Sequence, residues 1–205
     1  MLKDKVMSKS ITIKKALPYI YIIAGIIGCI VAISLTYDKI QVLKNPAYNP
    51  SCNINPILSC GSVMKTSQAN LLGVPNTLFG LIGFGMLSAF GLALLAGATF
   101  KKWLWQIINI GALAGFIFFV YLFFEGVFRI HAICPFCFVI WMITPPVLWY
   151  TTLYNIKENN FDLAFLKQKY RKWILSHHGD ILFTWYLAVF LILIIKFWYY
   201  WKTLI

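Results

Sequence analysis

Long apolar runs alternate with shorter polar segments along the chain. Five of these runs are long enough to cross a bilayer as a helix, which takes about 20 residues. They lie near 16–36, 76–98, 103–125, 133–154 and 181–201. We therefore expect an all-α integral membrane protein, with a bundle of four transmembrane helices and a fifth transmembrane helix. No small-residue cleavage signature follows the first run, so we interpret it as a retained helix and not as a signal peptide.

Two longer polar segments separate the runs, one near 37–75 and one near 155–180. The first holds three Asn-Pro pairs and a Gly-Val-Pro, which are turn signals and predict a compact extracytoplasmic cap with short helical turns. The second is basic and predicts an exposed cytoplasmic connector. Nothing marks a second domain, so we expect residues 1–205 to form one membrane domain, with the core bundle at about 16–154 and the fifth helix at about 181–201.

The composition supports this class and fixes an orientation. The chain is 60% hydrophobic and 12% charged, with a mean hydropathy of +0.77, which is too apolar for a water-soluble domain. Its formal net charge of +12 could indicate nucleic acid, but the basic residues lie mostly between the apolar runs. Twelve of the 18 Lys and Arg fall on the side of the N-terminus, so the positive-inside rule predicts a cytoplasmic N-terminus. We expect a multi-pass inner (plasma) membrane protein that contacts lipid and no nucleic acid.

Four of the five cysteines lie on the outer side in this topology. Cys52 and Cys60 are in the cap, and Cys134 and Cys137 form a Cys-Pro-Phe-Cys at the start of the fourth run. Pro135 suits the first position of a helix, which places Cys134 at the N-cap. The free amides and the helix dipole favour a thiolate there. Cys137 lies one turn deeper, at the edge of the hydrocarbon.

The two cysteine pairs would meet different molecules. Cys52 and Cys60 lie on a polar loop that a soluble protein could reach, whereas only a lipid-soluble molecule would meet Cys137. Thiol–disulfide exchange between the pairs would carry two electrons from one to the other. A four-thiolate zinc site is an alternative. Two structural disulfides are another, although a Cys-x-x-Cys bridge closes too small a loop to stabilise much. Cys29, inside the first run, is expected to pack as a small apolar residue.

The electron acceptor follows by elimination. The sequence has no dinucleotide-binding glycine motif for a flavin or nicotinamide, and no paired histidines within the membrane for haem. A membrane quinone remains, and we expect no metal. Glu125 and Arg129, four residues apart, are expected to form an interfacial ion pair.

Three features together resemble the vitamin K epoxide reductase family over roughly residues 16–154. They are Cys52-x7-Cys60, in which Cys60 stands in a Ser-Cys-Gly-Ser-Val at 59–63, the run Leu-Gly-Val-Pro-Asn-Thr-Leu-Phe-Gly at 72–80, and Cys134-x2-Cys137. The resemblance implies a four-helix bundle around a quinone, ubiquinone or menaquinone, with the outer loop as its lid.

The resemblance also implies a role for each cysteine. A soluble DsbA-like or thioredoxin-like partner would attack Cys52, Cys60 would exchange with Cys134, and Cys137 would pass electrons to the quinone. The fifth helix looks like the one that leads to a fused thioredoxin-like domain in many bacterial members. Because this chain stops there, we expect a separate partner.

The candidate ring contacts come partly from the same resemblance. Asn76 matches the family's quinone-contacting asparagine, and its alternative is a simple helix-start residue. Trp141 stands where some members have a quinone-contacting Tyr; its indole can donate a hydrogen bond but cannot accept one, and an interfacial anchor is its alternative. Phe79 and Phe138 are candidate pocket residues or ordinary core.

These observations predict a membrane thiol:quinone oxidoreductase that re-oxidises a periplasmic disulfide-forming protein. The direction of electron flow rests on a presumed bacterial setting and not on the sequence. One alternative is reduction of vitamin K or a quinone epoxide by a reduced partner. Another, of a different class, is a non-catalytic membrane scaffold with structural disulfides.

Overall fold

The computed structural model describes residues 2–45, 47–55, 57–70, 73–161 and 168–202. Within these ranges the chain is helical and no strand is formed. The elements are the α-helices α1 (Leu2–Lys44), α2 (Cys60–Met64), α3 (Asn76–Leu95), α4 (Lys102–Phe124), α5 (Pro135–Lys157), α6 (Gln168–Ser176), α7 (His178–Lys196) and α8 (Trp198–Trp201), the 3₁₀-helix η1 (Ser67–Asn70) and the π-helix η2 (Glu125–Ile130).

The prediction of five transmembrane helices is confirmed. The spans long and apolar enough to cross a membrane are Ile13–Lys44, Asn76–Leu95, Lys102–Ile130, Pro135–Lys157 and His178–Lys196. The prediction of short helical turns in the cap is also confirmed, because α2 and η1 lie in it.

The first predicted boundary is wrong, because α1 continues past residue 36 to Lys44. Hydropathy placed Asp38 and Lys39 in the loop, yet both side chains are buried against the cap. Lys39 Nζ donates to the carbonyl of Met64 at 2.5 Å. The cap therefore starts after Lys44, and α1 carries two charged residues beneath it.

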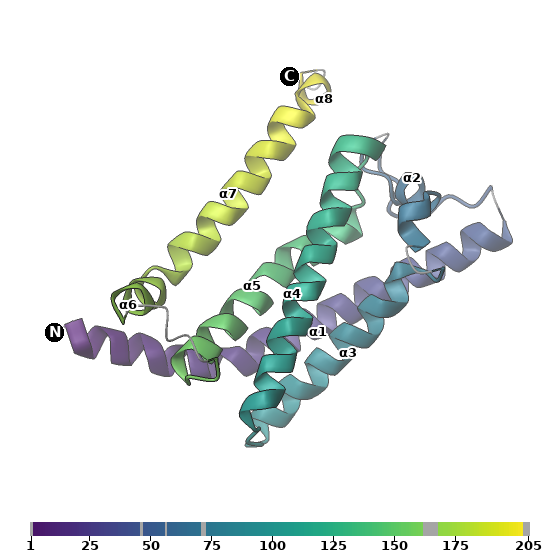
Figure 1. The fold of residues 1–205 in the computed structure, drawn as a ribbon. Helices are drawn as coiled ribbons and strands as arrows, with labels where there is room; N and C mark the ends of the chain where they lie inside the picture. The colour runs from purple at the N-terminus through teal and green to yellow at the C-terminus, as the bar shows by residue number, and fades with distance from the viewer. Residues whose placement is uncertain (1, 46, 56, 71–72, 162–167, 203–205) are drawn as a thin grey trace.

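The bundle is built around α1. It packs along α3 and against α5, which in turn packs against α4, while α7 runs beside α5 (Figure 1). Glycines let α1 and α3 approach closely, since a Cβ at Gly28 would overlap the ring of Phe84. Buried hydrogen bonds add to the packing, such as the 2.6 Å contact between Tyr21 and Thr151 that joins α1 to α5.

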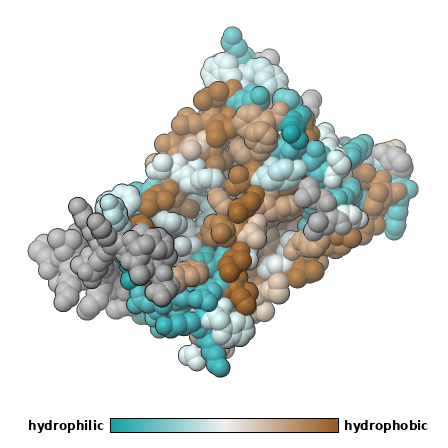
Figure 2. Space-filling model, in the orientation of Figure 1, coloured by the Kyte–Doolittle hydropathy of each residue, from teal (hydrophilic) through white to brown (hydrophobic). Residues whose placement is uncertain are grey.

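The outer surface suits a lipid environment. Large apolar side chains are exposed on outward faces, among them Ile23 on α1, Ile107 on α4 and Ile195 on α7. Figure 2 shows hydrophobic residues over the middle of one side of the molecule, with hydrophilic residues toward its edges. Such a broad apolar surface on a folded chain is what transmembrane helices present to lipid.

Candidate redox site

The cap is fastened to the bundle beside the start of α5. Leu58 and Ile133 form an isolated parallel β-bridge. The Ser59 amide donates to the Ile133 carbonyl at 3.0 Å, and the Ile133 amide donates to the Ile57 carbonyl at 2.6 Å. Because Cys60 and Cys134 directly follow these residues, the bridge places the two cysteines next to each other.

Three of the four cysteine sulfurs form a row. Cys52 and Cys60 are joined by a disulfide, and the Cys134 sulfur lies 3.0 Å from the Cys60 sulfur. Cys134 is the N-cap of α5, as its position before Pro135 predicts, and its sulfur accepts from the Cys137 amide at 3.4 Å. Cys134 is thus placed to attack, or to be attacked by, the cap disulfide at Cys60.

The surroundings of Cys134 favour its thiolate. Hydrogen bonding from the Cys137 side chain holds the pKa of the Cys134 thiol below its ordinary value, although burial opposes this, and the amides of Cys137 and Phe136 lower the pKa further. A thiol with a lowered pKa forms more thiolate near neutral pH. Since the thiolate is the attacking species in disulfide exchange, Cys134 is activated for it.

Access to the cap disulfide differs from the prediction. Cys52 is 5% exposed and Cys60 is 0% exposed, so the expectation that a soluble protein reaches them directly is wrong for this arrangement. Two hydrogen bonds hold the part of the cap around Cys52 in place. The Tyr48 hydroxyl donates to Asp38 at 2.9 Å, and the Gly61 amide donates to Asn53 Oδ1 at 2.9 Å. Cys52 is therefore largely covered in this arrangement.

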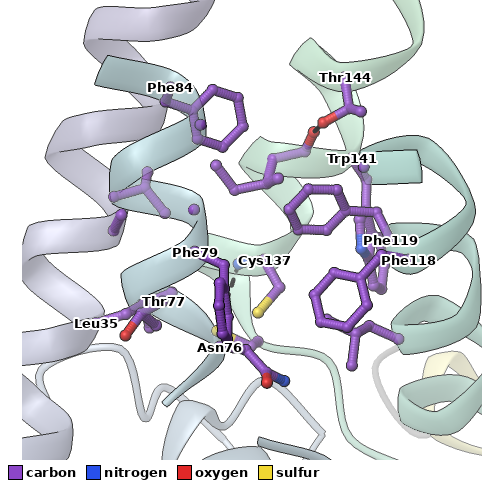
Figure 3. A pocket seen from close by; sticks show the side chains of 18 of the residues that line it. Leu35, Asn76, Thr77, Phe79, Phe84, Phe118, Phe119, Cys137, Trp141 and Thr144 are labelled. Carbon is purple, nitrogen blue, oxygen red and sulfur yellow. Dashed lines mark hydrogen bonds between the residues drawn. The ribbon is translucent and has the colours of Figure 1, made fainter. Parts of the chain in front are cut away.

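A cavity of about 640 Å³ lies beneath the cap, among α1, α3, α4 and α5. Its walls are mostly apolar, and Cys60, Cys134 and Cys137 all line it. In Figure 3 the Cys137 side chain lies between Phe79 of α3 and the aromatic side chains of α4. The second redox cysteine therefore faces a space of the size and polarity that suits an apolar ligand.

The structure brings three of the four predicted ring residues to this cavity, Asn76, Phe79 and Trp141. Phe138 is not among the residues that line it. Its ring packs instead against Phe190 of α7, with 5.9 Å between ring centroids, and against Trp141, with 6.1 Å.

Polar groups are few on the cavity wall. Trp141 lines the cavity, and its indole Nε1, which is itself buried, has no hydrogen-bond partner among the described residues. Asn76 Nδ2 donates to the carbonyl of Gln68 at 2.6 Å. An unpaired buried donor costs about 1–3 kcal/mol, so an acceptor such as a quinone carbonyl oxygen would remove that cost. The cavity thus fits a ring that carries oxygen acceptors.

The outer wall of the cavity also holds charged residues to which the sequence analysis gave no catalytic role. The Glu125–Arg129 ion pair is confirmed at 3.0 Å, and Glu125 also accepts from Gln68 Nε2 at 3.2 Å. Lys39 lines the same space. The signal that could have marked Asp38 and Lys39 is their place in a continuous helix, because charged residues within a transmembrane segment are often functional.

Comparison with known proteins agrees with this geometry. A model described as the Vitamin K epoxide reductase family matches residues 19–152, more than half of the chain, and the match includes all four cysteines of the site. No curated protein matches the chain significantly.

Proposed function

Because the chain belongs to the vitamin K epoxide reductase family, we propose that it is a membrane thiol:quinone oxidoreductase supporting disulfide bond formation. Members of this family are oxidoreductases that are linked to quinones and generally work with thioredoxin-like partners. The observation that carries the proposal is the row of sulfurs, in which Cys134 lies 3.0 Å from the cap disulfide and Cys137 lines the cavity.

The electron path uses both pairs in turn. A reduced DsbA-like or thioredoxin-like protein reduces the Cys52–Cys60 disulfide and leaves oxidised, so two thiols form in the cap. The Cys60 thiolate then attacks a Cys134–Cys137 disulfide and displaces Cys137. Cys52 next attacks Cys60, which re-forms the cap disulfide and releases Cys134. The net result is a reduced Cys134–Cys137 pair.

A quinone held in this cavity would accept two electrons and so would allow the Cys134 and Cys137 thiols to return to a disulfide. We assign Trp141 and Asn76 as hydrogen-bond donors to the ring oxygens and Phe79 as a face that packs on the ring. Phe138 acts indirectly, because its ring packs against Trp141 and holds that side chain in position. The assignment of Trp141 is supported by its indole Nε1, which has no hydrogen-bond partner in the part of the chain that the structure describes.

The proposed setting is the inner (plasma) membrane, with the N-terminus cytoplasmic and the cap in the periplasm. The excess of basic residues on the N-terminal side supports this orientation. An oxidising compartment is also where a cap disulfide persists. Flow from the partner to the quinone is part of the proposal.

We expect replacement of Cys60 by Ala to trap the soluble partner. The partner's thiolate can still attack Cys52 when that residue carries a small-molecule disulfide such as glutathione. The partner is supplied with its own second cysteine replaced by Ala, so that neither that cysteine nor Cys60 can resolve the product. A mixed disulfide between Cys52 and the partner should accumulate in non-reducing gels and disappear on adding reductant. The matched control is the double variant Cys52→Ala, Cys60→Ala. Equal adducts in both variants would contradict the assignment of Cys52 as the residue that meets the partner.

A further inference from the structure

Asp38 is a buried carboxylate at the outer end of α1 with no role in the scheme above. It is only 4% exposed, and its Oδ2 lies 3.9 Å from the Cys52 sulfur. Its Oδ1 accepts from the Tyr48 hydroxyl at 2.9 Å. This hydrogen bond raises the pKa of Tyr48, so Tyr48 stays protonated and remains the donor. Asp38 therefore touches a sulfur that reacts.

The two ends of the sulfur row have opposite surroundings. Cys52 has the Asp38 carboxylate beside it, whereas Cys134 accepts from the Cys137 amide and thiol at the start of a helix. A carboxylate disfavours negative charge on a neighbouring sulfur, and helix-start amides favour it. The other charged group next to Asp38 in sequence, Lys39, directs its ammonium to the Met64 carbonyl.

We propose that Asp38 sets the direction of disulfide exchange within Cys52, Cys60 and Cys134, driving it toward a closed Cys52–Cys60 bond and a reduced Cys134. The inference rests on the proposed function only in taking these three cysteines as an exchanging set. It assigns Asp38 as a catalytic residue that contacts the Cys52 sulfur.

The step balances within the chain. Cys52 loses its proton and attacks the Cys60 sulfur, the Cys52–Cys60 bond forms, and the Cys60–Cys134 bond breaks. Cys52 is oxidised, Cys134 is reduced and leaves as a thiolate, and the Cys52 proton passes through the Asp38 carboxylate to water or back to Cys134. Asp38 lies 3.9 Å from the Cys52 sulfur and disfavours a thiolate there. At Cys134 its charge is the smallest of the influences on the pKa, and the helix-start amides oppose it, so the products are favoured where both thiols ionise. The structure holds this product arrangement.

The test uses a variant in which Cys29→Ala and Cys137→Ala leave three cysteines, Cys52, Cys60 and Cys134, and one disulfide to be shared among them. The purified protein is equilibrated, quenched in acid and alkylated with N-ethylmaleimide after denaturation, and the labelled cysteine is identified by peptide mass spectrometry. This parent lacks the Cys137 thiol, but the amides of residues 136 and 137 still favour a Cys134 thiolate, so the label should fall mainly on Cys134. At a pH above the pKa of both thiols, adding Asp38→Asn should shift the ratio toward labelled Cys52 by up to about fivefold, the effect of two unit charges 4 Å apart in bulk water.

Two further variants test whether the negative charge of Asp38 causes the shift. Asp38→Glu keeps the charge and should keep the parent distribution, and Tyr48→Phe keeps the carboxylate and should leave the label on Cys134 even if Asp38→Asn does not fold. Asp180→Asn, the same change at an exposed site on α7, is the matched control. An unchanged ratio in Asp38→Asn, an equal shift in Asp180→Asn, or label moving to Cys52 in Tyr48→Phe would overturn the inference.

This measurement needs neither partner nor quinone. If the intact protein fails to reduce quinone, the proposed function fails while the test of Asp38 still stands. If quinone turnover is normal and Asp38→Asn leaves the disulfide distribution unchanged, only the role of Asp38 is wrong.

Discussion

Replacing Cys137 by Ala should abolish quinone reduction, with a fall on the order of 10³-fold or more, as expected when one member of a jointly reacting unit is removed. Without this thiol, Cys134 has no partner with which to re-form a disulfide as electrons leave. The cap exchange should survive, because Cys60 and Cys134 remain 3.0 Å apart. The measurement is quinone absorbance under anaerobic conditions, with reduced donor in excess.

The matched control for this change is Cys29→Ala. Cys29 lies between α1 and α3, with its sulfur 3.9 Å from the Leu81 carbonyl, so it should pack as a small apolar residue, as the sequence indicates. Its replacement should leave turnover unchanged. Turnover at the parent rate in Cys137→Ala, or equal losses in both variants, would show that electrons do not leave through Cys137.

The Trp141→Phe variant should lose affinity for quinone without losing stability. It keeps a ring in the cavity but removes the indole Nε1, which has no partner among the described residues. Losing one hydrogen bond to a ring oxygen should lower kcat/KM for quinone about tenfold, mostly through KM. Without quinone, removal of an unpaired buried donor should leave the melting temperature unchanged or higher.

A second tryptophan, Trp105, is the control for the Trp141→Phe variant. Trp105 is buried on α4, is not among the residues that line the cavity, and packs on Tyr154 with 4.0 Å between ring centroids. Trp105→Phe should lower the melting temperature and leave KM for quinone unchanged. If Trp141→Phe instead destabilises the protein and leaves KM unchanged, Trp141 is a packing residue.

Much of the fold follows from the sequence because transmembrane helices are defined by length and hydropathy. The end of α1 does not follow from the sequence, because hydropathy does not indicate that Asp38 and Lys39 are buried under a cap that folds back on them. The N-cap at Cys134 was predictable, because Pro135 fixes the start of the helix locally. The bridge between Leu58 and Ile133 depends on tertiary contacts and has no signal in either segment.

The residues predicted to contact the quinone ring could also be placed only in part from the sequence. Trp141 is four residues after Cys137 and shares its helix face, so both side chains line the cavity. Phe138 is one residue after Cys137, about 100° around the helix, and meets α7 instead. Helical spacing could have separated these two residues. The closure of Cys52 could not have been foreseen, because it depends on the contacts of Tyr48 and Asn53 with distant residues.

Anaerobic quinone reduction by the purified protein, supplied with a reduced DsbA-type donor, tests the central claim most directly. Ubiquinone and menaquinone are assayed separately, with vitamin K epoxide as a third acceptor. We predict that at least one quinone is reduced in stoichiometric exchange for donor disulfide, and that this turnover requires all four cysteines of the site. If neither quinone is reduced in a cysteine-dependent way, the account is contradicted. Reduction of the epoxide alone would favour an epoxide reductase. No reduction of any acceptor would favour a structural scaffold.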